Sequence, residues 1–498
     1  MASAVDVRRS LPGIAALLAT AVLIWFGTGL DPFWPCMWLA PVPVLLFALS
    51  ATWWSAALVA GAAMILGLVN LWGLLHGALR LPFGALAPLY ITEGVMFALA
   101  TLLFRALARR GALWSALLAF PAFWVAFEWS MNLSGPHGTG GSLAYSQLRF
   151  LPLLQLASLT GPWGITFLLC TFPAAVAIAI GLRTQAPQQA YRILGAATAV
   201  IAAVLLWGSA RLASPTAGAP VQVGLVASDG PNTAVADEGV PTARLLQAYG
   251  AVVAQLARQG AAVVVLPEKT GVTVEPDLKS VDDQLQALAE LNHVRVVAGL
   301  LRIVPSGGGQ PTRLRYNEAR VYTPGAQVER YDKEHMLPPF ESNLTPGTAL
   351  TLLTARGASA AWGVAICKDM DFTQLGRRYG AAGAGLMLVP AWDFNLDWIQ
   401  HGHMAVMRGV ESGFSVVRSA KGGSLFVSDD RGRILGEIRS NAAPFSSLLV
   451  AVPGGHDRTL FVLWGDWFAW VAVALLLLCL VQLVRSYRGR RLTGVDAP

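Results

Sequence analysis

The chain has 498 residues, which is too long for one ordinary domain, and 55% of them are hydrophobic. Its mean hydropathy of +0.53 is too high for a soluble enzyme, so part of the chain is expected to lie in lipid. The net charge of +7 at pH 7 does not indicate nucleic-acid binding, because juxtamembrane arginines account for much of it and no nucleic-acid motif accompanies them.

About eight apolar segments approach the roughly 20 residues that a bilayer-spanning helix needs. They lie at residues 11–30, 34–50, 53–75, 84–108, 112–131, 158–182, 192–212 and 461–484. The second is short and interrupted by proline, so the number of spans is open by one. Arg8 and Arg9 precede the first segment as in a signal peptide, but no small-residue cleavage site follows, so we expect an uncleaved span.

Basic residues between the spans predict how the chain crosses the membrane. With eight spans, the arginine-rich connections and the tail at 485–498 all fall on one face, which the positive-inside rule makes cytoplasmic. We therefore expect a transmembrane domain at 1–212, a domain at 213–459 on the extracytoplasmic face, and a final transmembrane helix at 460–484.

From Val221 the pattern changes to short β-type runs separated by helical stretches. Strands are expected at 221–226, 263–266, 294–301, 362–366, 386–390, 414–419 and 424–427. Helices are expected at 242–258, 281–291 and 400–412, and a hairpin turn at 429–432. Such alternation indicates a layered α/β domain of roughly 240 residues.

Three residues of complementary chemistry occur at the ends of such runs. Glu268 ends the apolar run from Val263, Lys333 lies in a polar turn, and Cys367 ends the apolar run from Trp362. A thiol must become a thiolate to attack a carbonyl; a carboxylate can take its proton, and an ammonium can stabilise the thiolate and the oxyanion. An isolated cysteine is more often an inert core residue, so the ordered trio is what indicates catalysis.

The remaining cysteines do not suggest other chemistry. Cys36, Cys170 and Cys479 lie in or beside the expected spans, and Cys367 is alone in the α/β part. No disulfide framework or metal-binding spacing can be drawn from them. We expect neither a metal nor a cofactor.

The sequence around the trio resembles the nitrilase, or carbon–nitrogen hydrolase, superfamily, whose catalytic set is Glu, Lys and Cys in that order. The matching segments are Pro267-Glu268, Tyr331-Asp332-Lys333, Ile366-Cys367 and, where that superfamily carries a second glutamate, Phe340-Glu341. The resemblance implies a four-layer α-β-β-α sandwich. The expected fold is thus a polytopic α-helical membrane domain with an inserted α/β nitrilase-like domain.

This combination resembles the apolipoprotein N-acyltransferase family over nearly the whole chain. Further matching segments are Tyr145-Ser146-Gln147, Gly161-Pro162-Trp163-Gly164, Tyr316-Asn317, Gln400-His401 and Met407-Arg408-Gly409-Val410-Glu411. The resemblance implies a multi-pass protein of the bacterial inner membrane with its catalytic domain on the periplasmic face. It also implies a phospholipid acyl donor, a diacylated lipoprotein acceptor and no cofactor.

The resemblance and the residue chemistry together imply a ping-pong reaction. Glu268 takes the proton of Cys367, the thiolate attacks a phospholipid ester, and Lys333 with nearby backbone N–H groups stabilises the oxyanion. The thioester then passes to the α-amine of a diacylglyceryl-cysteine. Glu341 is expected to position or deprotonate that amine. The expected substrate-binding residues are Glu341, Asp369, Lys368, Phe340 and Trp392.

Two segments depart from the family pattern. Lys368-Asp369 stands where the family usually has an aromatic residue and a glutamate, and Pro390-Ala391-Trp392-Asp393-Phe394 stands where it commonly has Asn-Asp before an aromatic pair. Lys368 adds a cation beside the thiol, and Asp369 is one methylene shorter than glutamate. These changes bear on donor preference and on the efficiency of transfer.

Further expectations concern apolar residues and histidines near the site, and one carboxylate in the membrane part. Leu337–Phe340 and Trp392–Trp398 are expected to form apolar lips that dip into the membrane surface. The histidines His335, His401 and His403 are expected to be packing or hydrogen-bonding residues. Glu128, at the end of a span, suits either a helix-pairing or an interfacial position.

Two alternative functions remain open on sequence alone. One is a membrane-anchored amidase or nitrilase, in which water resolves the thioester. The other is a non-catalytic relative that binds lipoprotein or lipid. Several spans are more than a tether requires, and an intact Glu-Lys-Cys set argues against binding alone.

Overall fold

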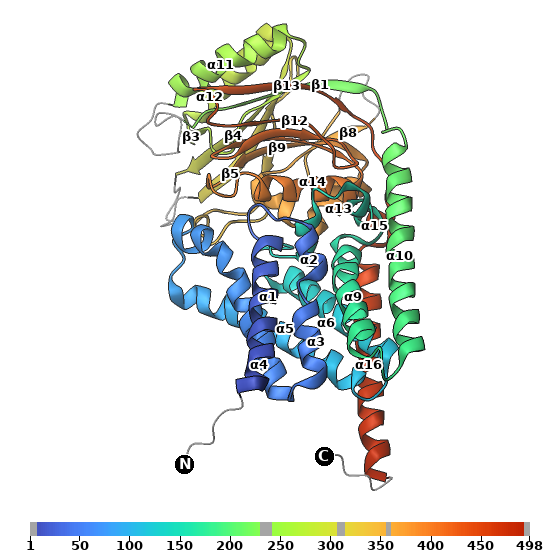
Figure 1. Cartoon of the computed structure of the whole chain (residues 1–498). Helices are drawn as coiled ribbons and strands as arrows, with labels where there is room; N and C mark the ends of the chain where they lie inside the picture. Colours follow the sequence, from blue (N-terminus) through green and yellow to red (C-terminus); the bar gives the residue numbers. More distant parts are fainter. Residues whose placement is uncertain (1–6, 230–241, 306–313, 355–359, 493–498) are drawn as a thin grey trace. The chain divides into compact units, whose positions relative to one another are not determined.

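The computed structural model describes residues 7–229, 242–305, 314–354 and 360–492 (Figure 1). The chain divides into two compact units. One comprises Met1–Leu133, Gly141–Arg211 and Asp466–Pro498, and the other comprises Ser134–Gly140 and Leu212–Gly465.

The first unit is helical. Six of its described helices are long and apolar enough to cross a membrane: α4 (Trp53–Leu68, extended to Leu71 by a short 3-10 turn), α5 (Phe83–Ala108), α6 (Leu113–Ser134), α9 (Pro162–Gly181), α10 (Pro187–Ala213) and α16 (Trp467–Leu492). The segments expected to span at 11–30 and 34–50 form shorter apolar helices, namely α1 (Val7–Gly27) and the pair α2 (Pro35–Leu39) and α3 (Val42–Ser50). Pro41 separates α2 from α3, because proline removes a backbone donor.

Glu128 of α6 joins helices within this unit. Its Oε1 accepts hydrogen bonds from Trp124 Nε1 (3.0 Å) and Leu143 N (2.8 Å), and its Oε2 from the hydroxyls of Ser142 (2.7 Å) and Thr166 (2.8 Å). All of these donors belong to the same unit. Glu128 therefore anchors the 3-10 helix at Leu143–Gln147 to α6 and α9, which is the helix-pairing use of a costly buried carboxylate.

The second unit contains two β-sheets. The first sheet has the order β13-β1-β2-β4-β5-β6, with β3 paired to β4, and the second has the order β12-β11-β10-β9-β8-β7. Strands of the first sheet are β1 (Pro220–Ala227), β2 (Val263–Val265), β3 (Gly271–Val274), β4 (Arg295–Val304), β5 (Leu314–Tyr322), β6 (Glu329–Asp332) and β13 (Ser446–Pro453). Strands of the second are β7 (Leu352–Leu353), β8 (Ala361–Val364), β9 (Ala384–Trp392), β10 (Ser415–Lys421), β11 (Ser424–Ser428) and β12 (Ile434–Arg439).

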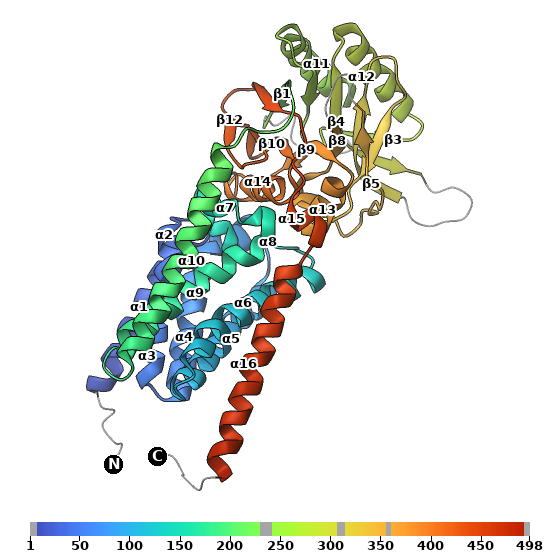
Figure 2. The ribbon, with the colours of Figure 1, turned by 90° about the vertical axis from the view of Figure 1, so that its right-hand side faces the viewer.

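Helices cover the outer faces of the two sheets, so the unit has four layers (Figures 1 and 2). The helices are α11 (Thr242–Arg258) and α12 (Leu278–Asn292) on the first sheet, and α13 (Thr373–Ala381) and α14 (Gln400–Ser412) on the second. One apolar cluster joins the inner faces of the sheets, including Val265 of β2 and Leu388 of β9. Another joins the first sheet to α11 and α12. The expected α-β-β-α sandwich is confirmed, because the two sheets pack face to face and helices cover both outer faces.

Candidate active site

Glu268 lies just beyond the end of β2, with 2% of its surface exposed. Its backbone N–H donates to the carbonyl of Ala391 at the end of β9, so the turn bridges the ends of both sheets. A Cβ atom on Gly299 of β4 would lie 2.5 Å from the Pro267 carbonyl oxygen and 2.6 Å from Glu268 Cα. Glycine is therefore required at position 299 for the Glu268 turn to lie this close to β4.

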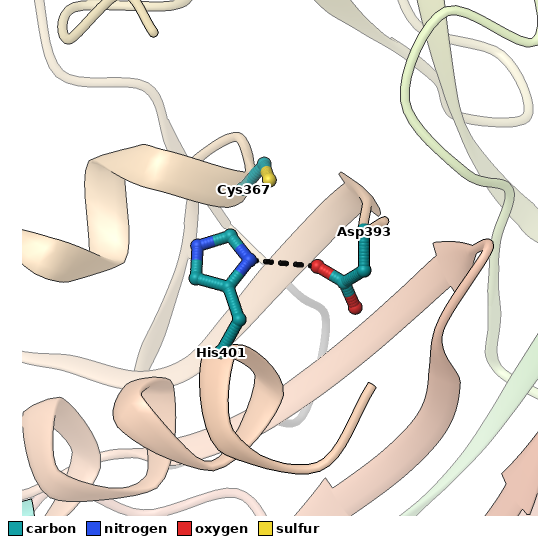
Figure 3. Close-up of side chains that lie close together, drawn as sticks. All are labelled: Cys367, Asp393 and His401. Atoms are coloured by element: carbon teal, nitrogen blue, oxygen red, sulfur yellow. Dashed lines mark hydrogen bonds and ion pairs between the residues drawn. The ribbon is translucent and has the colours of Figure 1, made fainter. Parts of the chain in front are cut away.

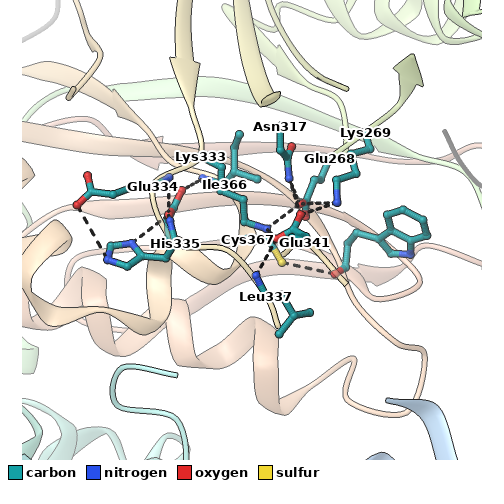
Figure 4. A network of polar contacts seen from close by, with 12 residues as sticks. Glu268, Lys269, Asn317, Lys333, Glu334, His335, Leu337, Glu341, Ile366 and Cys367 are labelled. Carbon is teal, nitrogen blue, oxygen red and sulfur yellow. Dashed lines mark hydrogen bonds and ion pairs between the residues drawn. The ribbon is translucent and has the colours of Figure 1, made fainter. Parts of the chain in front are cut away.

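Lys333 directly follows β6 and enters the same cluster (Figure 4). Its Nζ donates to Glu268 Oε1 (2.9 Å) and to Glu341 Oε2 (2.7 Å). Burial alone would lower the pKa of Lys333, but the two carboxylates raise it above its ordinary value, so the group is a cation. An ammonium has three N–H donors, and the third remains for an oxyanion.

Cys367 begins a 3-10 helix (Cys367–Asp371) and is separated from the end of β8 by two residues. Its φ of +45° is in the left-handed region, which costs a non-glycine residue on the order of 1–3 kcal/mol and is concentrated at functional sites. The side chain is 5% exposed, and its Sγ donates to the Trp392 carbonyl oxygen at 3.5 Å. The sharp turn brings the thiol beside the cluster that contains Glu268 and Lys333 (Figure 4).

The charges around Cys367 favour a resting thiol with a carboxylate base beside it. Burial and the Glu268 carboxylate raise the pKa of Cys367 well above its ordinary value, while Lys333 and Arg418 act in the opposite direction. Hydrogen bonds from the described residues to the Glu268 carboxylate all go to Oε1. Oε2 therefore remains to accept the thiol proton, as general-base activation requires.

Glu341 has no oxygen left for a proton. Its Oε1 accepts hydrogen bonds from Lys269 Nζ (2.5 Å) and Asn317 Nδ2 (2.8 Å). Its Oε2 accepts from Lys333 Nζ (2.7 Å) and Leu337 N (3.0 Å). Burial favours the neutral acid, but the ammoniums of Lys333 and Lys269 lower the pKa of Glu341 to about 2. These contacts argue against the base role expected for Glu341 and indicate that it holds Lys333 in place.

Both carboxylate oxygens of Asp369 also accept hydrogen bonds from other residues of the protein. Its Oδ1 accepts from the backbone N–H groups of Glu334 (3.2 Å) and His335 (2.8 Å). Its Oδ2 accepts from the Tyr331 hydroxyl (2.9 Å) and from Ile366 N (3.0 Å). The side chain is fully buried. Asp369 thus ties the nucleophile turn to the loop after β6, which is a positioning role in place of the substrate-binding role expected from sequence.

Substituting Asp369→Asn is expected to destabilise the protein by about 2–3 kcal/mol, because an NH₂ group would face donors that need an acceptor. Asp283→Asn is the matched control, since Asp283 pairs with Lys279 on the surface with 65% of its side chain exposed. Thermal unfolding in detergent measures both. Equal midpoints for the two variants would contradict the assigned role of Asp369.

Lys368 is buried beside the nucleophile and is also paired within the unit. Its Nζ donates to Asp371 Oδ2 (3.2 Å) and lies 3.1 Å from His137 Nδ1. The Thr139 hydroxyl donates to the Asp371 carbonyl oxygen at 2.7 Å. Lys368 and Asp371 therefore fasten the segment Ser134–Gly140 to the nucleophile turn, and the substrate-binding role expected for Lys368 stays a prediction.

Of the aromatic residues expected at the site, Phe340 is 48% exposed and its ring centroid lies 5.6 Å from that of Phe394. Leu396, two residues beyond Phe394, is 52% exposed. Trp392 is half-buried, and Lys421 Nζ lies 3.8 Å from its ring centroid. The structure thus places exposed apolar side chains on two loops that follow Lys333 and β9, and it uses Trp392 partly for packing.

Asn317 and Lys421 belong to the site but were not among the residues selected from sequence. Asn317 Nδ2 donates to Glu268 Oε1 (2.5 Å) and to Glu341 Oε1 (2.8 Å) and so links the two carboxylates. Lys421 Nζ donates to the Lys269 carbonyl oxygen (3.0 Å), and burial lowers the pKa of Lys421 to about 7. Asn317 lies within β5 and Lys421 ends β10. For Lys421 the available signal was a polar residue just after the apolar run at 414–419, and for Asn317 it was the matching segment Tyr316-Asn317.

A second polar group adjoins Cys367 on the side of α14 (Figure 3). One side-chain atom each of Cys367, Asp393 and His401 lies within 4.8 Å of the others, and His401 Nδ1 is 2.8 Å from Asp393 Oδ1. Arg418 donates to both oxygens of Asp393 at 2.8 and 2.6 Å. Because this guanidinium would repel a metal cation and already occupies the carboxylate, the donor set does not suit a metal.

Comparisons with known proteins agree with this architecture. A family model described as the apolipoprotein N-acyltransferase N-terminal domain matches residues 15–175, and the carbon-nitrogen hydrolase model matches residues 236–442. An apolipoprotein N-acyltransferase from Bradyrhizobium diazoefficiens is 29% identical over 80% of this chain and 79% of its own length. The corresponding protein of Geobacter metallireducens is 27% identical over 72% of this chain and 73% of its own.

Among solved structures, an amidase from Nesterenkonia sp. is similar to 48% of this chain and 92% of its own, at 20% identity and a TM-score of 0.38. The fold and the matched family models define a polytopic membrane protein that carries a carbon–nitrogen hydrolase domain. Within that class, the chain is similar to apolipoprotein N-acyltransferases over 72–80% of its length, and its N-terminal part matches the model of their N-terminal domain.

Proposed function

We propose that this chain transfers an acyl chain from a phospholipid to the N-terminal α-amine of diacylglyceryl-cysteine lipoproteins, through a thioester on Cys367. The buried cluster of Glu268, Lys333 and Cys367 is the observation that carries the proposal. The chain that holds it is similar to apolipoprotein N-acyltransferases, and its described residues include six apolar helices long enough to span a bilayer.

In the first half-reaction, Glu268 Oε2 takes the proton of Cys367 and the thiolate adds to the carbonyl carbon of a phospholipid ester. The third N–H of Lys333 stabilises the oxyanion. When the C–O bond breaks, Glu268 returns the proton to the glycerol oxygen, and a lysophospholipid leaves. The acyl chain remains on sulfur, and Glu268 is again ionised.

In the second half-reaction the neutral α-amine of the acceptor attacks the thioester. Glu268 is the base for this step as well, because the four donors around Glu341 and its low pKa leave that residue unsuited to accept a proton. The amine loses its proton to Glu268, the C–S bond breaks, and Cys367 recovers its proton. One carboxylate thus serves both halves of the ping-pong cycle.

The exposed loops beside the site are proposed to meet the membrane surface. Replacing Phe340 with alanine is expected to slow transfer from long-chain phospholipid in vesicles several-fold, while a short-chain ester dissolved in detergent is used at an unchanged rate. Leu291→Ala is the control, because Leu291 is 82% exposed but lies on α12. Equal losses on both substrates would contradict a membrane contact by Phe340.

The catalytic domain at 213–459 is proposed to face the periplasm of a bacterial inner membrane, as the arginine-rich connections on the other face suggest. A reporter inserted after Gly307, which lies outside the described residues, is expected to read extracytoplasmic, and one at the C-terminus cytoplasmic. If both reporters read the same side, the proposed arrangement of spans is wrong.

The function is tested with the full chain in vesicles that contain phospholipid and a synthetic diacylated lipopeptide. We expect lysophospholipid and N-acylated peptide to form in equal amounts. Free fatty acid without peptide acylation, or ammonia released from simple amides, would support the hydrolase that the carbon–nitrogen hydrolase match also allows. No reaction with either substrate class would support a lipid- or lipoprotein-binding relative.

A further inference from the structure

His401 lies beside the nucleophile but takes no part in the proton transfers described above. It is on the first turn of α14, where its ring points toward Asp393 and Cys367 (Figure 3), and a second buried carboxylate, Asp371, lies near its other nitrogen. Nδ1 is 2.8 Å from Asp393 Oδ1, and Nε2 is 3.5 Å from Asp371 Oδ1. The histidine therefore bridges the residue after β9 and the end of the nucleophile turn.

We propose that His401 is a positioning residue that acts as an imidazolium counter-charge, offsetting Asp371 and Asp393 so that Cys367 can form a thiolate. The proposal rests on the nucleophilic role of Cys367 in the proposed function. It concerns a residue that neither donates to nor accepts from the substrate. The bond that breaks is S–H, its proton goes to Glu268, and the electron pair stays on sulfur.

The geometry gives His401 a direct influence on sulfur. One of its ring nitrogens and an Asp393 oxygen both lie within 4.8 Å of Cys367 Sγ. An ionised Asp393 at this distance raises the pKa of the thiol. Its negative charge must therefore be balanced before the thiolate can form at neutral pH, and an opposite charge at such a distance typically lowers a pKa by about 1–3 units.

The charged groups around His401 can be counted by the elements that supply them. Asp371 comes from the nucleophile turn, while Asp393 and Asp397 come from the segment after β9, with Asp397 Oδ2 3.9 Å from Nδ1. On the cationic side, Lys368 pairs with Asp371 and Arg418 pairs with Asp393. Lys368 and Arg418 thus supply two positive charges against three buried aspartates, and a charged His401, which lies between Asp371 and Asp393, supplies the third.

The buried acids also keep this charge over the relevant pH range. Burial alone would lower the pKa of His401, but Asp371 and Asp393 raise it to about 10. The raised value means that the proton is retained up to about pH 10 and is lost only above it. His401 is thus a fixed cation at neutral pH and not a pH sensor.

His403, which lies two residues after His401 in α14, provides a matched control. It is also a histidine beside a carboxylate, with Nε2 3.0 Å from Glu437 Oε1, and it packs against Phe426. The structure assigns it no contact with Cys367. A change at His403 therefore reports what loss of a histidine–carboxylate pair on this helix does to the fold.

The test is the rate of alkylation of Cys367 by iodoacetamide at pH 8, in the full chain in detergent, followed by peptide mass spectrometry. Because the pKa of the thiol lies well above this pH, the rate is proportional to the small thiolate fraction, and His401→Gln is expected to lower it about tenfold or more. His403→Gln is expected to leave the rate unchanged, and His401→Lys, which keeps the charge, is expected to restore most of it. Iodoacetamide needs neither phospholipid nor lipopeptide, so this result is independent of whether the proposed transfer occurs.

An alkylation rate that does not fall in His401→Gln, or that falls equally in His403→Gln, would overturn the proposal, because a purely structural role changes folding without changing the thiol pKa selectively. If His401→Gln fails to fold, NMR of the unaltered chain labelled with ¹³C-histidine decides the question. A His401 ring that is protonated at pH 8 supports the counter-charge, and a neutral ring contradicts it.

Discussion

Cys367→Ala is expected to lose at least about 10³-fold in acyl transfer, because the reaction then has no atom on which to form the covalent intermediate. Cys367→Ser should lose most activity too, since Glu268 is placed to activate a thiol and a hydroxyl is far less acidic. The fold should survive both changes, because Cys367 contributes one weak hydrogen bond to the Trp392 carbonyl.

Initial rates of lysophospholipid release measure this effect. Cys479→Ala is a matched control, because Cys479 is a buried free cysteine of α16 and belongs to the other unit. It should retain activity. Transfer by Cys367→Ala within tenfold of the unaltered protein would show that another residue, or no residue, carries the acyl group.

Glu268→Gln is expected to lower turnover by about 10²–10⁴-fold, the usual contribution of a general base. The same substitution should leave alkylation of Cys367 by iodoacetamide as fast or make it faster. The reason is that the Glu268 charge raises the pKa of the thiol, so a neutral amide in its place makes the thiolate easier to form. Turnover and alkylation are therefore expected to change in opposite directions.

The comparison of these two rates separates catalysis from folding. A variant that is merely misfolded would lose turnover while Cys367 is alkylated with the rate and pH dependence of a free, exposed cysteine. Glu341→Gln is the informative partner, because Glu341 holds Lys333 but accepts no proton in the proposed cycle. If Glu341→Gln lost turnover while Glu268→Gln kept it, the assignment of the base to Glu268 would be wrong.

The catalytic trio could be selected from sequence because each member follows a segment with a clear pattern. Val263–Val265 and Ala361–Val364 are short apolar strands. Two residues separate the first from Glu268 and the second from Cys367. The helices α11 and α14 begin and end where their periodicity indicates. In these segments local pattern and tertiary structure agree, so a layered α/β domain could be inferred from the pattern, and the family resemblance added the four-layer sandwich.

The strand β5 shows where such inference fails. Its residues include Asn317, Glu318 and Arg320, which are polar, so the segment does not resemble a buried strand, yet all three are buried. Glu318 is compensated by Arg302 and Arg320 at 2.9 and 3.0 Å. Compensation of this kind depends on residues distant in sequence, and no local pattern reports it.

The hydrogen bonds of Glu341 and Asp369 could not be predicted from sequence for the same reason. Sequence shows that a carboxylate is present, but whether its oxygens are free depends on donors from other segments. The carboxylate oxygens of Asp369 accept hydrogen bonds from backbone N–H groups that come close to it only in the folded chain. Residue type predicted the chemistry, and three-dimensional contact decided which carboxylate performs it.

The central claim is that Cys367 carries the acyl group taken from a phospholipid. The most direct measurement is mass spectrometry of the full chain after incubation with phospholipid alone. We expect one acyl chain on the Cys367 peptide and an equal amount of lysophospholipid. When diacylated lipopeptide is then added, we expect the adduct to disappear from Cys367 and the acyl chain to appear on the lipopeptide. Release of lysophospholipid and free fatty acid with no adduct on Cys367 at any time would contradict the account.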